Sequence, residues 1–236
     1  MTNAADADDA AGSGATVPPA VAAAEIDLLG ALAYGELTGF LRLAQDAGIA
    51  PSLPETAALG ALAADEFAHY RLLAERIGAL GADPQEAMAP FVAALDAYHE
   101  RTTPNDWLEG LVKAYVGEGI ATDFYREIAA YAPAQTRDLV RRVLEGTGGA
   151  EFIVGAVRQA IEAEPRVGGR LALWARRLVG EALSQAQRVA ADRDALTSLL
   201  TGTVDRPGMD LAAISRMFSR LIETHTRRMS KLGLQA

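Results

Sequence analysis

Apolar residues that recur every three or four positions over long segments limit this chain to helices. In residues 54–80 the apolar side chains that share one helical face are Leu59, Leu62, Leu73, Ile77 and Leu80. Similar stripes run through residues 21–47, 84–101, 103–131, 133–164, 170–200 and 210–233. The chain has no run of alternating β-branched residues, so no strand is predicted. We therefore expect an all-α protein.

Length and terminal composition predict one helical domain that follows an acidic tail. The chain has 236 residues, of which 50% are hydrophobic, and this is enough for one buried core in residues 21–236. Residues 1–20 are small and acidic, so we expect a disordered tail and no signal peptide. No segment offers the roughly 18 uncharged apolar residues that a membrane span needs. A cytoplasmic protein without membrane contact is predicted.

The charge of the chain is unevenly distributed. The net charge is -9, but residues 1–136 carry 6 basic and 20 acidic side chains, whereas residues 137–236 carry 16 basic and 11 acidic ones. The basic C-terminal half could contact a polyanion such as tRNA. The alternative is that acidic and arginine-rich helix faces complement each other, within the fold or across a homodimer.

Three of the helical stripes contain a glutamate at a position where an apolar residue is expected. These residues are Glu36, Glu66 and Glu118. Burying an isolated carboxylate costs several kcal/mol, so each must be paired, protonated or bound to a metal, unless it reaches water at the edge of its stripe.

Glu66 has a histidine one helical turn further on, so the side chains of Glu66 and His69 can point at one spot. Carboxylate oxygen and imidazole nitrogen suit iron, manganese or zinc. The chain contains no cysteine, which excludes disulfides, thiolate zinc sites and cysteine nucleophiles. Antiparallel helices would bring Glu36 next to Glu66 across a hairpin. The first two long helices therefore predict half of a metal site.

Other ionisable residues receive structural interpretations. Glu181 is expected to form a salt bridge with Arg176 or Arg177. His225 is interpreted as a packing or surface residue. His99, at the end of its helix, is interpreted as a solvated or capping side chain. Glu109 and Asp123 lie off the apolar face of residues 103–131, and we expect both to be solvated.

A glycine cluster interrupts the predicted helix of residues 133–164. Three of the four residues from Gly146 to Gly149 are glycine. Each glycine inside a helix costs about 1 kcal/mol relative to alanine. A bend or a break is therefore predicted at this point.

Several segments together resemble the ferritin-like superfamily of di-iron carboxylate proteins, and within it the bacterial group similar to the tRNA methylthio-isopentenyl-adenosine hydroxylase. The segments that carry the resemblance lie between Ile26 and Gly233 and are Gly35-Glu36-Leu37, Asp65-Glu66-Phe67-Ala68-His69, Gly117-Glu118, Leu173-Trp174-Ala175-Arg176-Arg177-Leu178, Gly180-Glu181-Ala182-Leu183 and His225-Thr226-Arg227-Arg228-Met229. The resemblance implies a ferritin-like four-helix bundle with additional helices, including a C-terminal helical extension. It also implies O2-dependent hydroxylation at a non-haem iron site, with tRNA as substrate. The residues that match metal ligands of the family are Glu36, Glu66, His69 and Glu118.

The chain departs from the family pattern on the fourth helix of the bundle. Where the pattern implies an acid and a histidine three residues later, this chain has Gly146 and Gly149. Neighbouring Glu145 and Glu151 are out of step with these positions, so neither simply substitutes. Two hypotheses follow: a hydroxylase-like enzyme with one or two iron ions, or manganese or zinc, and a non-catalytic ferritin-like binding or structural protein that has lost its metal.

Overall fold

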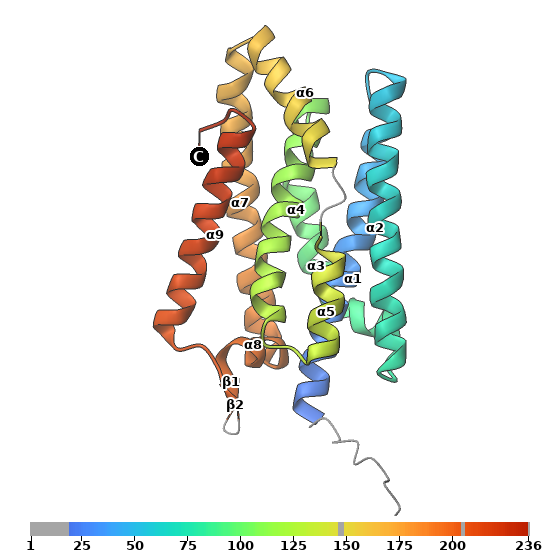
Figure 1. Ribbon diagram of the computed structural model, residues 1–236, viewed down its shortest axis with the longest axis vertical. Coiled ribbons are helices and arrows are strands. Elements are labelled where there is room, and N and C mark those ends of the chain that lie inside the picture. The colour runs from blue at the N-terminus through green and yellow to red at the C-terminus, as the bar shows by residue number, and fades with distance from the viewer. Residues whose placement is uncertain (1–18, 146–148, 204–205, 236) are drawn as a thin grey trace, which may run out of the picture.

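The described part of the chain, residues 19–145, 149–203 and 206–235 of a computed structural model, is almost wholly helical (Figure 1). In chain order its helices are α1 (Pro19–Gly48), α2 (Leu53–Ala79), α3 (Pro84–Arg101), α4 (Trp107–Ala129), α5 (Ala134–Val143), α6 (Gly149–Ala163), α7 (Arg166–Asp192), α8 (Asp194–Thr201) and α9 (Leu211–Lys231). The all-α prediction is confirmed. The expectation of no strand is wrong in one detail, because β1 (Gly202–Thr203) and β2 (Arg206–Pro207) pair antiparallel. The predicted tail falls almost entirely outside the described residues.

The helices begin and end where the sequence places local signals. Pro54 and Pro84 occupy first-turn positions of α2 and α3, where a missing backbone N–H costs nothing. The Asp83 carboxylate accepts hydrogen bonds from the backbone N–H groups of Gln85 and Glu86. Asp106 caps α4 in the same way through the N–H of Glu109. These caps account for the agreement between the expected and observed boundaries.

Two long predicted helices are divided in the structure. The segment 133–164 forms two helices, because α5 ends at Val143 and α6 begins at Gly149, so the predicted break is confirmed, although residues 146–148 lie outside the described residues. A continuous helix was expected over residues 170–200, but the structure has α7, which already begins at Arg166, and α8, and the two are separated at Arg193. The prediction of a continuous helix is wrong because a tertiary contact interrupts the helix at this residue. The Arg193 guanidinium bonds to the Asp27 carboxylate on α1, with Nε and Oδ2 3.1 Å apart.

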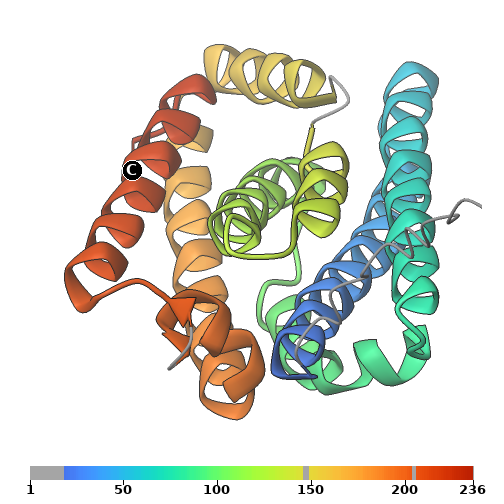
Figure 2. The ribbon, with the colours of Figure 1, turned by 60° about the horizontal axis from the view of Figure 1, so that its bottom comes forward.

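The helices pack in two groups on either side of α4 (Figures 1 and 2). Helices α1 and α2 form an antiparallel hairpin on one side, and α5 and α6 follow each other along the bundle beside α4. On the other side lie α7 and α9, both of which pack against α4. Helix α8 covers the N-terminal part of α1. Helix α4 is therefore central, with neighbours on most of its surface.

The apolar core is split into two clusters along the bundle axis. One includes Leu32 of α1, Leu73 of α2 and Ile128 of α4. The other includes Leu43 of α1, Leu59 of α2 and Leu111 of α4. Each of the three helices therefore passes through a layer between the clusters, and this layer holds the glutamates predicted from the sequence.

Arginines of the C-terminal half pair with acids of the N-terminal half. These pairs are Arg170 with Asp106 and Glu109, Arg193 with Asp27, Arg220 with Glu127, and Arg228 with Asp123. The pairs support the interpretation that the two halves neutralise each other within the fold. A tRNA partner and a homodimer stay predictions. In the described residues, no helix is both long enough and apolar enough to cross a bilayer.

Candidate metal centre

Four polar side chains meet in the layer between the two apolar clusters. Helix α1 contributes Glu36, α2 contributes Glu66 and His69, and α4 contributes Glu118. All four line one small recess of about 20 Å³, which is room for roughly one water-sized particle. All four residues that the sequence proposed as ligands thus line one recess, and the group whose ligand atoms lie close enough to share an ion consists of Glu36, Glu66 and His69.

The geometry of Glu36, Glu66 and His69 fits a shared cation. One ligand atom from each lies within 4.8 Å of the other two. The Nδ1 atom of His69 is 3.2 Å from Oε2 of Glu36, and the two side chains are 18% and 12% exposed. Because zinc, for example, bonds to oxygen and nitrogen at about 2.0–2.2 Å, donor atoms on opposite sides of one ion lie about 4 Å apart. The donor set and its spacing therefore match a transition metal ion.

Burial raises the pKa of all three carboxyl groups in this layer. Burial raises the pKa of Glu36 to about 7, although a hydrogen bond with Glu66 opposes the rise. Burial, that hydrogen bond and the charge of Glu36 raise the pKa of Glu66 to about 10. Burial and the charge of Glu66 raise the pKa of Glu118 to about 7. In the described part of the chain, no lysine or arginine lies within 4.0 Å of these carboxylates. A bound cation would replace the protons that these groups otherwise retain.

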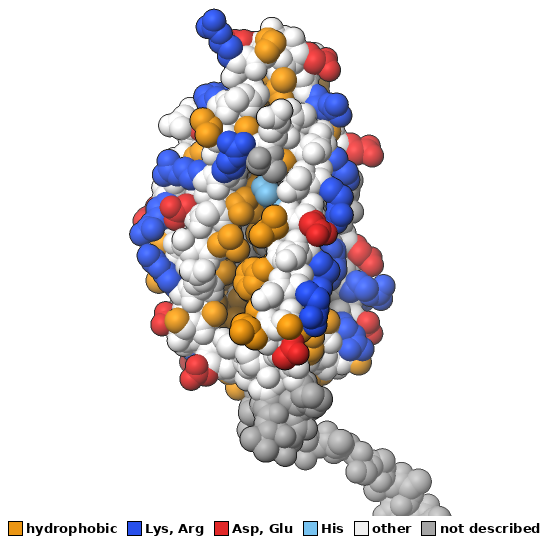
Figure 3. Space-filling model, turned by 90° about the vertical axis from the view of Figure 1, so that its left-hand side faces the viewer, with side chains coloured by type: hydrophobic (Ala, Val, Ile, Leu, Met, Phe, Trp, Pro, Cys, Tyr) orange, Lys and Arg blue, Asp and Glu red, His pale blue; other side chains and the backbone are white. Residues whose placement is uncertain are grey.

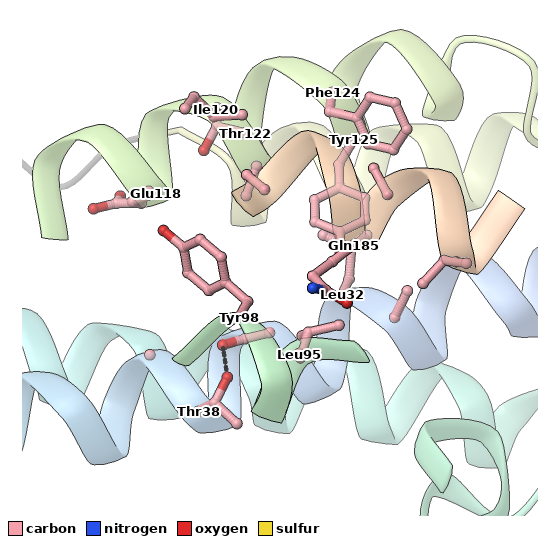
Figure 4. Close-up of a pocket in the computed structure, with 18 of the residues that line it drawn as sticks. Leu32, Thr38, Leu95, Tyr98, Glu118, Ile120, Thr122, Phe124, Tyr125 and Gln185 are labelled. Carbon is pink, nitrogen blue, oxygen red and sulfur yellow. Dashed lines mark hydrogen bonds between the residues drawn. The ribbon is translucent and has the colours of Figure 1, made fainter. Parts of the chain in front are cut away.

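Glu118 connects the recess to a larger space. Its side chain projects from α4 at the same end of the cavity as the Tyr98 side chain of α3 (Figure 4). Glu118 is more exposed than Glu36 and Glu66, and it lines both the recess and the adjoining cavity. The exposed part of the Glu118 side chain therefore faces the cavity. The protein that surrounds the cavity still raises the pKa of this carboxyl group.

The fourth helix of the predicted four-helix bundle corresponds to α5 and α6, and it contributes apolar side chains to the recess. Val143 and Leu144, at the end of α5, line the recess beside the acids. Glu145 is exposed and pairs with Arg141, and Glu151 is exposed on α6. Gly146 lies outside the described residues, and Gly149 is the first residue of α6. The prediction that neither neighbouring glutamate substitutes at the site agrees with these positions.

A cavity of about 410 Å³ runs along α4 between the two groups of helices. Its walls come mainly from α1, α3, α4, α7, α8 and α9, with Glu66 of α2 and Leu144 at the end of α5 beside them, and most of the lining side chains are apolar. Leu32, Leu95 and Tyr125 are among those that Figure 4 shows around it. Cavities of this size and character hold small molecules in other proteins. On the face that carries α7 and α9, Figure 3 shows a hollowed apolar stripe with basic side chains on either side.

Several polar residues of the cavity were not predicted from the sequence. His99 was interpreted as solvated or capping, but it lines the cavity, and burial lowers its pKa to about 3. Lys113 is buried in the same region. Gln185 points into the cavity from α7 (Figure 4). A lysine inside the run Leu111-Val112-Lys113-Ala114-Tyr115-Val116 was the sequence signal that could have found this region.

The remaining sequence interpretations have mixed outcomes. Glu181 forms a salt bridge, but its partner is Arg101, at 3.6 Å, and not Arg176 or Arg177. His225 is buried, and it lines the cavity.

Glu109 and Asp123 were expected to be solvated, and this is wrong. Glu109 is buried and accepts hydrogen bonds from the backbone and side-chain nitrogens of Asn105. Asp123 pairs with Arg228 of α9 at 2.7 Å. Both acids hold helices together.

Comparisons with known proteins agree with this architecture. The family described as "Ferritin-like domain, actinomycetes" matches residues 20–203. A solved structure, described as protein 19 with aldehyde deformylating oxidase activity from Synechococcus, is similar over 93% of this chain and 94% of its own. The TM-score is 0.70 and the sequence identity is 18%, so this likeness shows the fold alone. No protein with a curated description matches the chain in sequence. The predicted ferritin-like fold is confirmed, whereas the narrower likeness to tRNA hydroxylases stays a prediction.

Proposed function

We propose, for a chain that belongs to the ferritin-like domain family described for actinomycetes, that a transition metal ion binds at Glu36, Glu66, His69 and Glu118 and that the protein oxidises an apolar substrate in the adjoining cavity. Iron is the expected metal, because its ligand preferences match three carboxylates and one imidazole. One ion per chain is expected, since the described residues of α5 add no further oxygen or nitrogen ligand to the recess.

The observation that carries the proposal is that the same carboxylates line both spaces. Glu36, Glu66 and Glu118 form one wall of the recess, and they also border the apolar cavity. A molecule in the cavity would therefore lie directly against the metal centre. When a substrate is held this close to a reactive centre, the two react at the rate of an intramolecular reaction.

The reaction class is insertion of one oxygen atom of O2 into a C–H bond. The other oxygen atom leaves as water, and this balance requires two electrons from an external reductant and two protons. When bound, the metal supplies activation of O2. The residues of this chain hold the ion and position the substrate, and the apolar walls keep water away from the reacting atoms.

A second candidate function is a non-catalytic binding protein of the same fold. The observation in its favour is that Val143 and Leu144 occupy the recess from the fourth helix of the bundle. In this case the cavity would hold an apolar ligand with no dependence on metal.

Metal analysis of three forms of the protein tests the first function. Protein loaded anaerobically with Fe2+ should retain about one ion per chain, and chelation should lower its thermal stability. Glu66→Gln should bind less than about 0.2 ion per chain, because it removes a ligand charge. Glu75→Gln, an exposed position on the same helix, should bind like the wild type.

The decisive follow-up is O2 consumption by the loaded protein with a reductant and long-chain hydrocarbons. Substrate-dependent consumption that Glu66→Gln abolishes is the expected result. If the wild type retains less than about 0.2 ion per chain and chelation does not destabilise it, the oxidase function is excluded. The non-catalytic binding function then remains.

A further inference from the structure

The cavity has a second cluster of polar groups, separate from the acids, where the ends of α1 and α3 meet the start of α4. Its central residue is Lys113, which is only 8% exposed and lines the cavity. The ammonium group donates a hydrogen bond to the backbone oxygen of Thr102 at 2.7 Å, and it contacts that of His99 at 3.5 Å. Among the described residues, no carboxylate lies within 4.0 Å of Lys113, so this buried cation has no ion-pair partner.

Two neutral groups beside Lys113 are also buried and unpaired. The hydroxyl of Tyr98 and Nδ1 of His99 have no hydrogen-bond partner in the described structure, and both residues line the cavity. The Lys113 ammonium lies 5.5 Å from the centre of the Tyr98 ring. A Cβ atom on Gly117 would be 2.9 Å from the Tyr98 hydroxyl, so the glycine leaves room for it. Buried polar groups without partners are uncommon, and a ligand bound in the cavity would supply the missing partners.

The charges of this end of the cavity add up to one positive charge. Arg42 and Lys113 are cationic and Asp46 is anionic, and all three line the cavity. His99 is neutral, because burial and the two neighbouring cations oppose its protonation. One carboxylate would neutralise the cluster and accept the hydrogen bonds that Tyr98 and Lys113 can still donate.

We propose that Lys113, Arg42 and Tyr98 bind the carboxylate of a long-chain fatty acid whose tail extends along α4 through the apolar part of the cavity. This inference rests on the proposed function, because it names the molecule that occupies the same cavity.

The direction of the bound chain follows from the positions along α4. Lys113 and Glu118 are separated by about 7.5 Å of helix, and Lys113 and Ile128 by about 22 Å. All three residues line the cavity. A fatty acid with its carboxylate at Lys113 would therefore pass the acid cluster part of the way down its tail and end near Ile128 and α8. The carbon presented to the metal centre is a methylene group and not the head group.

The opposite orientation is disfavoured by charge. A carboxylate placed at the acid cluster of the metal-free protein would face Glu36, Glu66 and Glu118. None of these carboxyl groups offers a positive charge to pair with the head group, and any that is ionised repels it in this buried site. The polar end at Lys113 has the complementary charge, and the apolar end near Ile128 and Leu196 has none.

Binding of a fluorescent fatty acid to the metal-free protein tests the head-group site. The probes are cis-parinaric acid and its methyl ester, which differ only in the charge of the head group. The acid should bind at least about tenfold more tightly than the ester, because only the acid can pair with the buried cation. In Lys113→Met the two affinities should become similar, through a loss for the acid alone. The control is Lys231→Met, because Lys231 is the only other lysine of the chain and is exposed.

Two milder variants test the head-group site if Lys113→Met unfolds the protein. Arg42→Gln and Tyr98→Phe should each weaken binding of the acid about threefold or more and leave the ester unchanged. Equal affinities of the wild type for acid and ester would overturn the head-group site but leave the cavity as a ligand site. No binding of either probe would overturn both, and metal retention would be unaffected by any of these results.

Discussion

The carboxylate of Glu66 on α2 lies against Gly39 on α1, at a place where a side chain on Gly39 would reach it. A Cβ atom built on Gly39 would be 3.2 Å from Oε2 of Glu66, which is closer than ordinary van der Waals contact. Gly39 also lies one turn beyond Glu36, so α1 provides one ligand and the space for another. The absence of a side chain at Gly39 is therefore part of the candidate metal centre.

Gly39→Ala should weaken metal binding without unfolding the protein. The added methyl group would shift the Glu66 carboxylate by a few tenths of an ångström, and we expect a loss of metal affinity of about tenfold. Alanine favours a helix by about 1 kcal/mol over glycine, so the metal-free protein should be equally or more stable. Gly60→Ala, where nothing lies within 4 Å, should raise stability and leave metal affinity unchanged. Titration with Fe2+ and thermal unfolding measure the two effects.

The stability of the metal-free protein should fall as pH rises through neutrality. Burial raises the pKa of Glu36 from 4.5 to about 7, so between these values the folded state binds more protons than the unfolded state. The free energy of unfolding must then decrease with rising pH, and for Glu36 the loss is about 3 kcal/mol by pH 8. Glu66 and Glu118 act in the same direction, because burial also raises their pKa values.

Chemical denaturation of chelator-treated protein between pH 5 and pH 8 measures this dependence. Glu36→Gln should flatten the curve, since glutamine does not titrate. Metal binding should show the opposite trend, with affinity that increases over the same pH range as protons leave the ligands. A wild-type protein whose stability rises from pH 5 to pH 8 would contradict the prediction.

Filling the cavity should separate ligand binding from metal binding. Ala186 of α7 lines the cavity, and Ala186→Phe should exclude an apolar ligand with a loss of affinity of about tenfold or more. Metal stoichiometry should not change, because Ala186 does not line the acid recess. Ser184→Phe places the same ring two residues away at an exposed position and should alter neither property. A parallel loss of metal in Ala186→Phe would show that the two sites are not separable.

The sequence identifies the candidate metal ligands because each lies in a helical stripe that is otherwise apolar. Glu36, Glu66 and Glu118 interrupt regular patterns, and their spacing alone brings them to one level of a hairpin bundle. Helix boundaries were also predictable where proline or aspartate marks a start, as at Pro84 and Asp106.

The polar end of the cavity was harder to predict from the sequence because α4 is surrounded by other helices. A single apolar stripe describes a helix with one buried face, whereas α4 is packed against α1 on one side and against α7 and α9 on the other. Lys113 and Glu109 lie off the predicted stripe and were assigned to water or not considered, yet both are buried. The division between α7 and α8 at Arg193 has no local signal either, because its cause is the distant Asp27.

Glu109 provides a test of how strongly these unpredicted contacts stabilise the fold. Its carboxylate accepts hydrogen bonds from Asn105 at 2.8 Å and pairs with Arg170 of α7 at 2.5 Å. Glu109→Ala should lower the free energy of unfolding by about 2–3 kcal/mol, because it removes three contacts of a buried charge while Arg170 can still reach water. Glu100→Ala, at an exposed position, should change it by less than about 0.5 kcal/mol.

Metal affinity should be the same in Glu109→Ala as in the wild type. Glu109 and Glu118 are separated by about 13 Å along α4, and the acid recess does not include Glu109. Urea denaturation and metal titration of the same preparation measure both properties. A variant that kept full stability would show that the first turn of α4 is held by its apolar contacts alone, and that the buried ion pair with α7 contributes no net stability.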